Sequence, residues 1–401
     1  MDRMSLASKP DFLRDTLSAW GAAANGVTTK TSKERTKYWR HWCDYAAAAH
    51  IDPYLDPDTV PPLERDIIAG AFAARVRTGQ YGRGHQIKVG GVSDALAAIS
   101  KTIELAGQPS QLYRADHKYQ LHLERVMEGF RRADPPAVPQ LAVPVSVAKH
   151  AFRSSLLTKS PVARHSGALI IVAFYYLLRV GEYTQPPMVT INGQRVRATR
   201  TVQFSVGNVG FFAKGRIIPR SAPLKDLLRA DLATLKISNQ KNGRMGQTIS
   251  HNITGTKSCP VRALASIVHH ILSHGGSDSD PLSSYYYKGD WKTVTAKQIV
   301  TRVRSVVAEL NLAEHGIDPD LVGAHSLRAG GAMALKLHGF DDTTIMKIGR
   351  WTSLTFLQYI HNQIAHLSTD ISKTMSIDLP FVNVAAIEPA NAASDQATHN
   401  T

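Results

Sequence analysis

A histidine and an arginine near the C-terminal end of the sequence have the spacing of two groups that act on one phosphate. His325 and Arg328 lie three positions apart, so on a helix they share a face. Arginine offers a planar fork of donors that matches a phosphate, and it stays charged at any working pH. Tyr359, on an amphipathic segment downstream, is a candidate nucleophile toward that phosphate. Alone, an HxxR pattern is more typical of a capped helix with a surface arginine.

A second arginine follows the longest apolar run of the chain, residues 168–178. This run is too short to span a bilayer and predicts a buried helix. A charged residue at the end of such a run, Arg179, costs free energy when it is buried without a partner. Glu182, three positions on, can be that partner. The pair alone fits equally well a structural ion pair that closes a helix. The small residues 329–332 behind Arg328 let another backbone approach that helix closely.

As an ordered set, these residues resemble the tyrosine recombinase (phage-integrase) family, in the variant found in cryptons and other eukaryotic mobile elements. The family's three boxes match residues 177–182 (LLRVGE), 325–328 (HSLR) and 349–359, where Gly349, Arg350 and Trp351 precede Tyr359. The family's second His/Trp commonly follows the glycine directly, whereas here Arg350 holds that place and Trp351 comes next. Either residue can face the phosphate, and Trp351 is the preferred choice.

The resemblance implies DNA strand cleavage and rejoining, as in site-specific recombination or DNA integration. Tyr359 attacks the phosphate and forms a 3′-phosphotyrosyl intermediate, while Arg179 and Arg328 hold the non-bridging oxygens. His325 orients or deprotonates the reacting groups, and Glu182 supports Arg179. No cofactor is implied, and the sequence contains no HExxH or Cys/His zinc spacing, so no catalytic metal is expected.

The family also places a catalytic lysine on a β-hairpin. Asn242-Gly243 is a strong hairpin turn signal, and Lys241 lies directly before it. Lys241 is therefore the preferred general acid, with Lys236 as runner-up and Lys214 a distant third. A surface hairpin lysine without a catalytic role is the alternative. We expect strands at 201–204, 234–237 and 247–251, and a Ser/Gly/Tyr loop at 273–287.

Composition predicts two domains and a nucleic-acid partner. The chain has 401 residues, of which 43% are hydrophobic, enough for two cores. Its formal net charge of +15 suggests a nucleic-acid partner, although a merely basic protein is not excluded. Cys43 and Cys259 form neither a disulfide scaffold nor a thiolate zinc site, which indicates a reducing compartment. The N-terminus lacks a secretory h-region, so we expect an intracellular protein, nuclear if eukaryotic.

The predicted fold is mainly α with a small antiparallel β-sheet. A lead-in (1–27) precedes a helical core-binding domain (28–133), whose first helix starts with Thr31 as N-cap. A Pro-rich linker (134–145) leads to an α+β catalytic domain (146–372) and a tail (373–401) that is disordered at its end. Basic residues that could contact DNA, rather than form a solvated face, are Lys33, Lys37, Arg40, Arg302 and Arg304.

The expected partner is double-stranded DNA, with a homotetramer assembled on it, as the resemblance implies, and no membrane. Two rival functions use the same residues. A type IB topoisomerase relaxes DNA alone, and a DNA-binding protein derived from a recombinase has lost catalysis. The ordered set of residue types argues against the second, and the helical domain before a Pro-rich linker argues weakly against the first.

Overall fold

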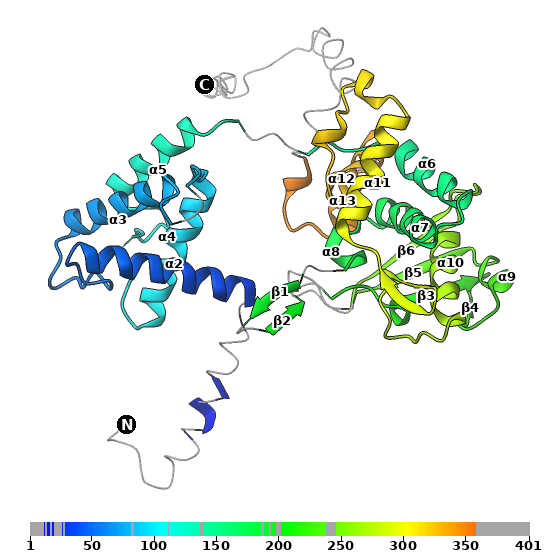
Figure 1. The fold of residues 1–401 in the computed structure, drawn as a ribbon, viewed down its shortest axis with the longest axis horizontal. Helices are drawn as coiled ribbons and strands as arrows, with labels where there is room; N and C mark the ends of the chain where they lie inside the picture. Colours follow the sequence, from blue (N-terminus) through cyan, green and yellow to red (C-terminus); the bar gives the residue numbers. More distant parts are fainter. Residues whose placement is uncertain are drawn as a thin grey trace, which may run out of the picture.

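The computed structural model describes residues 29–357 apart from 82–83, 111, 137–139, 186–187, 192–193, 198–201 and 238–245, together with positions 12, 14–16, 18–19 and 26. Over these residues the chain is mainly helical with a small antiparallel sheet, as predicted. Helices α2–α5 gather into one bundle, and α6–α13 form a larger body with the sheet (Figure 1). None of the described helices combines the length and the apolar character that a membrane crossing requires.

The bundle confirms the four helices that apolar periodicity predicted. They are α2 (Thr29–Ala48), α3 (Pro62–Arg77), α4 (Val89–Leu105) and α5 (Leu121–Ala133). Trp42, Phe72 and Ile99 are fully buried members of the core that these helices share. The helix α2 begins at Thr29, before the predicted cap, so the interpretation of Thr31 as N-cap was wrong.

The Pro-rich stretch is attached to the folded bodies at both of its ends. Asp134 accepts hydrogen bonds from the Arg77 guanidinium and from the Val89 amide of the bundle. The second body begins before its first helix, α6 (Val145–Leu156), because the Leu141 amide donates to the Leu321 carbonyl at 3.0 Å. Ala142 and Val143 are buried there. The chain thus joins the second body several residues before α6, and the domain boundaries themselves remain a prediction.

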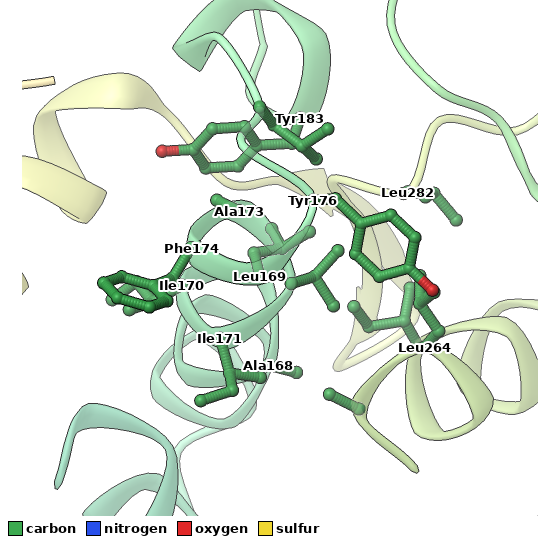
Figure 2. Close-up of a cluster of buried hydrophobic side chains, with 14 of the residues drawn as sticks. Ala168, Leu169, Ile170, Ile171, Ala173, Phe174, Tyr176, Tyr183, Leu264 and Leu282 are labelled. Carbon is green, nitrogen blue, oxygen red and sulfur yellow. The ribbon is translucent and has the colours of Figure 1, made fainter. Parts of the chain in front are cut away.

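The second body is built around α7 (Pro161–Tyr175), which is apolar on all sides and therefore buried. Figure 2 shows Leu169, Ile171 and Phe174 projecting from this helix in different directions, with Leu264 of α10 nearby. The helices packed around or beyond it are α10 (Pro260–Ser273), α11 (Ala296–Glu309), α12 (Ser326–Leu337) and α13 (Asp342–Gly349), with the short helices α8 (Val180–Tyr183) and α9 (Leu224–Leu227).

A four-stranded antiparallel sheet has the order β4-β3-β5-β6. Its strands are β3 (Val209–Ala213), β4 (Arg216–Ile218), β5 (Leu232–Lys236) and β6 (Thr248–Asn252). The pairing of β5 with β6, in which Lys236 faces Thr248, confirms the strands predicted at 234–237 and 247–251. Two separate hairpins are β1 (Met188–Ile191) with β2 (Gln194–Arg197), and β7 (Ser284–Tyr287) with β8 (Asp290–Thr293).

One strand prediction and one loop prediction were wrong. The described residues 202–204 form no strand, because the Phe204 amide donates to the Glu182 carbonyl and the Phe204 carbonyl accepts from Leu282. The predicted loop at 273–287 contains the strand β7. Its hairpin closes through Lys288-Gly289, and β3–β4 closes through Lys214-Gly215, with positive φ at all four residues. Such turns match the strand twist, and the two Lys-Gly pairs were the missed signals.

Candidate active site

A pocket of about 150 Å³ brings together residues from distant parts of the chain. Its lining residues are Arg179, His325, Arg328, Ala329 and Trp351. Arg179 directly precedes α8, His325 and Arg328 lie at the start of α12, and Trp351 follows α13. The pocket therefore joins the predicted boxes at one place.

Arg179 is held by Glu182 while part of its side chain stays open. Its Nη1 donates to Glu182 Oε1 at 3.1 Å, and its backbone amide donates to Glu182 Oε2 at 2.8 Å. The Arg179 side chain is 20% exposed, whereas that of Glu182 is 3% exposed. The predicted ion pair is present, and it leaves Arg179 able to meet a ligand in the pocket.

His325 and Arg328 come from the first turn of α12. His325 is the exposed N-cap residue, and Arg328 is buried. Arg328 Nη1 donates to the Leu177 carbonyl at 2.9 Å, and its Nη2 donates to the Gly349 carbonyl. The Arg328 guanidinium lies 4.2 Å from the centre of the Trp351 ring, a cation–π contact. Arg328 is therefore fixed from several sides.

Glycines allow α12 to approach its neighbours as closely as the sequence predicted. A Cβ on Gly330 would lie 2.0 Å from the Val143 carbonyl oxygen, and one on Gly331 would lie 2.4 Å from that of Phe174. Both distances are too short for a real side chain, so these two positions require glycine. The close packing sets how far the start of α12 lies from the end of α7.

Leu177 has a left-handed backbone, with φ of 48°, in the turn between α7 and α8. This conformation is uncommon for a bulky residue. It presents the Leu177 carbonyl to Arg328 Nη1 and to Arg350 Nη2, each at 2.9 Å. Sequence reasoning missed this carbonyl, and nothing in the local sequence signals it.

Arg350 lies behind the pocket. Its Nη1 and Nη2 donate to the two carboxylate oxygens of Glu182 at 3.1 and 3.0 Å. Arg350 is 2% exposed, and burial lowers the pKa of its guanidinium, which the Glu182 carboxylate opposes. Of the two candidates for the second His/Trp position, Trp351 lines the pocket and Arg350 supports Glu182.

Charge at this site favours an anion. Arg179 and Arg350 both bond the carboxylate of Glu182, and the Arg328 guanidinium bonds the Leu177 carbonyl and lies against the Trp351 ring. One carboxylate cannot balance the two guanidinium groups that it bonds, so positive charge is in excess beside the pocket. Arginine forks matched to a phosphate are the chemistry that this arrangement offers.

Two predicted catalytic residues, Tyr359 and Lys241, lie outside the described residues. Tyr359 follows the last described residue, Leu357, by two positions, after the 3₁₀ turn η4 (Leu354–Phe356). The Phe356 ring is fully buried and lies 5.4 Å from that of Trp351, measured between ring centres. The chain is therefore anchored beside a pocket residue three positions before Tyr359.

The alternative lysines are both described. Lys236 is exposed at the end of β5, and Lys214 lies in the β3–β4 turn. Neither lines the pocket. The segment that contains Lys241 connects β5 to β6.

The basic residues predicted to contact DNA fall into two groups. On α2, Lys33, Lys37 and Arg40 are exposed. Arg302 instead pairs with Glu309 and donates to Ser154 Oγ at 2.6 Å. Arg304 donates to the carbonyls of Val322 and Asp320 at 2.8 and 2.9 Å. Arg302 and Arg304 thus hold parts of the fold together, and their contact with DNA stays a prediction.

No protein-family model and no curated protein matches this chain. Its fold is similar to three solved structures described as a Tn1549 transposon integrase fragment with circular intermediate DNA, the XerH site-specific recombinase bound to palindromic difH substrate, and the XerA recombinase. The identities are 13%, 14% and 14%, and the TM-scores 0.44, 0.43 and 0.35. The matches cover 90%, 78% and 89% of this chain, and 97%, 72% and 96% of the other chains. At these values, the likeness assigns neither family nor activity to this chain.

Proposed function

We propose that this protein breaks and rejoins DNA strands with Tyr359 as the nucleophile. The observation that carries the proposal is the pocket in which Arg179, His325, Arg328 and Trp351 meet. Two guanidinium groups, an imidazole and an indole N–H around a small positive pocket suit one phosphodiester. The net charge of +15 and the exposed basic ridge of α2 suit a long polyanion that extends beyond that phosphate.

In the proposed reaction, the Tyr359 oxygen attacks the scissile phosphorus and the bond to the 5′ oxygen breaks. The phenol proton leaves to His325 or to water, and Lys241 gives a proton to the departing 5′ oxygen. Arg179 and Arg328 stabilise the charge that accumulates on the non-bridging oxygens. The 3′-phosphotyrosyl bond preserves the energy of the broken bond, so a 5′-hydroxyl can reseal the strand by the reverse step.

The proposal extends to site-specific recombination or DNA integration by four copies of the chain on two duplexes. The proposal also includes membership of the eukaryotic mobile-element variant, because Gly349-Arg350-Trp351 followed by Tyr359 resembles the last box of that variant. A location in the nucleus would follow if the host is eukaryotic.

The experiment that tests the proposal is a trap on nicked duplex DNA, in which the short fragment carrying the 5′-hydroxyl diffuses away after cleavage. The wild-type protein is expected to form an adduct that survives denaturation, and Tyr359→Phe is expected to form none. Tyr287→Phe, a change at an exposed tyrosine of β7, is the matched control and should react like wild type. An adduct of equal yield from Tyr359→Phe would contradict the proposal.

If wild type binds DNA in a strongly salt-dependent manner but forms no adduct on any nicked duplex tried, the chain is a DNA-binding protein without catalysis. If wild type does form the adduct and relaxes any supercoiled plasmid without joining two sites, the topoisomerase alternative holds.

A further inference from the structure

Gln140 reaches the backbone of the pocket from outside α12. Its Oε1 accepts a hydrogen bond from the His325 amide, at a nitrogen–oxygen distance of 3.2 Å. A Cβ on Gly323 would lie 2.4 Å from the Gln140 amide carbon, so this side chain lies directly on the Gly323 backbone. Gln140 and His325 are 185 positions apart, and no sequence signal pointed to their contact.

The segment that contains Gln140 is itself firmly placed. The Leu141 amide donates to the Leu321 carbonyl at 3.0 Å, and the Val143 amide donates to the Ser326 carbonyl at 3.3 Å. Val143 is buried, and its carbonyl oxygen lies directly against Gly330 of α12. These backbone contacts hold Gln140 beside the loop that precedes α12 without help from its own side chain.

The loop before α12 also closes on itself. The Gly323 amide donates to Ser326 Oγ at 2.9 Å, and the Ser326 amide donates to the Gly323 carbonyl at 3.2 Å. These bonds fix the two ends of the turn, and the Gln140 bond fixes the peptide nitrogen of His325 between them. The direction in which the His325 side chain leaves the backbone depends on that peptide.

We propose that Gln140 is a positioning residue for His325, which it holds with the imidazole at the wall of the phosphate pocket. The inference rests on the proposed function, because it gives His325 a part in the cleavage step. Without the Gln140 oxygen, the His325 peptide can turn and the imidazole can leave its place relative to Arg179 and Arg328. Small displacements of this kind slow a reaction strongly while they leave binding nearly intact.

The test compares Gln140→Leu, Gln140→Glu and the control Gln108→Ala, a change at an exposed glutamine of the bundle. Single-turnover adduct formation on nicked duplex DNA is measured at saturating protein, together with duplex affinity and thermal unfolding. Gln140→Leu has a similar size but no acceptor, so adduct formation should slow by about tenfold with affinity unchanged. Gln140→Glu keeps an acceptor oxygen and should recover most of the rate, which a merely structural role would not require. Gln108→Ala should react like wild type.

A double-mutant cycle sharpens the test. Gly323→Ala places a methyl group where the Gln140 amide lies, so it should slow cleavage in the wild-type background. In the Gln140→Leu background the same change should add little, because the bond is already lost. Additive losses, or a Gln140→Leu protein that cleaves at the wild-type rate, would overturn the role of Gln140 alone. A wild type without any adduct would overturn the proposed function and this inference together.

Discussion

Arg350 and Glu182 form a two-pronged buried ion pair across 168 positions of the chain. Both Arg350 terminal nitrogens bond the Glu182 carboxylate, and the same carboxylate holds Arg179 at the pocket. Arg350 also shares the Leu177 carbonyl with Arg328. Arg350 does not line the pocket, but it bonds Glu182, which holds Arg179, and the Leu177 carbonyl, which holds Arg328.

Loss of Arg350 should damage both stability and cleavage. Arg350→Met leaves Glu182 buried with only part of its counter-charge, so the free energy of unfolding should fall by about 3–5 kcal/mol. Urea unfolding of Arg350→Met and of the double variant Arg350→Met/Glu182→Leu measures this. The double variant should be the less stable of the two, because the loss of Glu182 leaves the mostly buried Arg179 without its partner, and neither variant should cleave DNA. A single variant within about 1 kcal/mol of wild type would contradict the positioning role of Arg350.

Trp351 should be needed for cleavage because its ring lies against Arg328. Trp351→Ala should slow adduct formation by about tenfold, the value of a well-packed cation–π contact, and Trp351→Phe should slow it less. Gly349→Ala should resemble Trp351→Ala, because a Cβ there would lie 1.6 Å from the Trp351 ring. Trp291→Ala, on the β7–β8 hairpin, is the control. Equal rates for Trp351→Ala and Trp291→Ala would refute this role.

The general acid can be identified by replacing the leaving 5′ oxygen of the substrate with sulfur and measuring the cleavage rate of lysine variants. If Lys241 protonates the 5′ oxygen, Lys241→Ala should slow cleavage by about 10²–10⁴-fold. A substrate with sulfur in place of that oxygen needs no such proton and should restore the rate. Lys236→Ala should behave like wild type on both substrates. A sulfur rescue seen for Lys236→Ala instead would transfer the role to Lys236.

Stability should decline in mild acid because two histidines are buried in neutral form. Burial lowers the pKa of His165 and of His251 from 6.5 to about 4. Between pH 6.5 and 4 the unfolded chain binds more protons than the folded one. The contribution of these histidines to the free energy of unfolding is therefore complete above pH 6.5 and is lost as the pH falls toward 4. Each group contributes at most about 1.4 kcal/mol per pH unit.

Urea unfolding at pH 7, 6 and 5 checks this prediction. His251→Phe removes a group whose buried Nε2 has no hydrogen-bond partner among the described residues, so it should flatten the decline. An unchanged slope in His251→Phe would show that another group causes the decline.

The long helices and the Arg179–Glu182 pair could be predicted because both depend on near neighbours in sequence. Apolar periodicity defined α3, α4 and α5, and a spacing of three positions sufficed for the ion pair. The contacts of Glu182 with Arg350 and of His325 with Gln140 join segments that only the folded chain brings together. No local pattern encodes them, so sequence reasoning left the choice between Arg350 and Trp351 open and missed Gln140.

Two of the three hairpins that were missed, β3–β4 and β7–β8, have a different explanation. Each closes through a Lys-Gly pair, at Lys214-Gly215 and Lys288-Gly289, in which the lysine also adopts a positive φ. Asn-Gly and Asp-Gly are the stronger signals for such turns, so a lysine in the first position gave little warning.

The central claim is tested most directly by the identity of the residue that carries the DNA. After trapping on nicked duplex, the adduct is digested with protease and nuclease, and the peptide that retains a nucleotide is sequenced by mass spectrometry. The account predicts a phosphodiester from the Tyr359 oxygen to a 3′ nucleotide, with a free 5′-hydroxyl on the released strand. A nucleotide on any other residue, or a linkage through a 5′ phosphate, would contradict it.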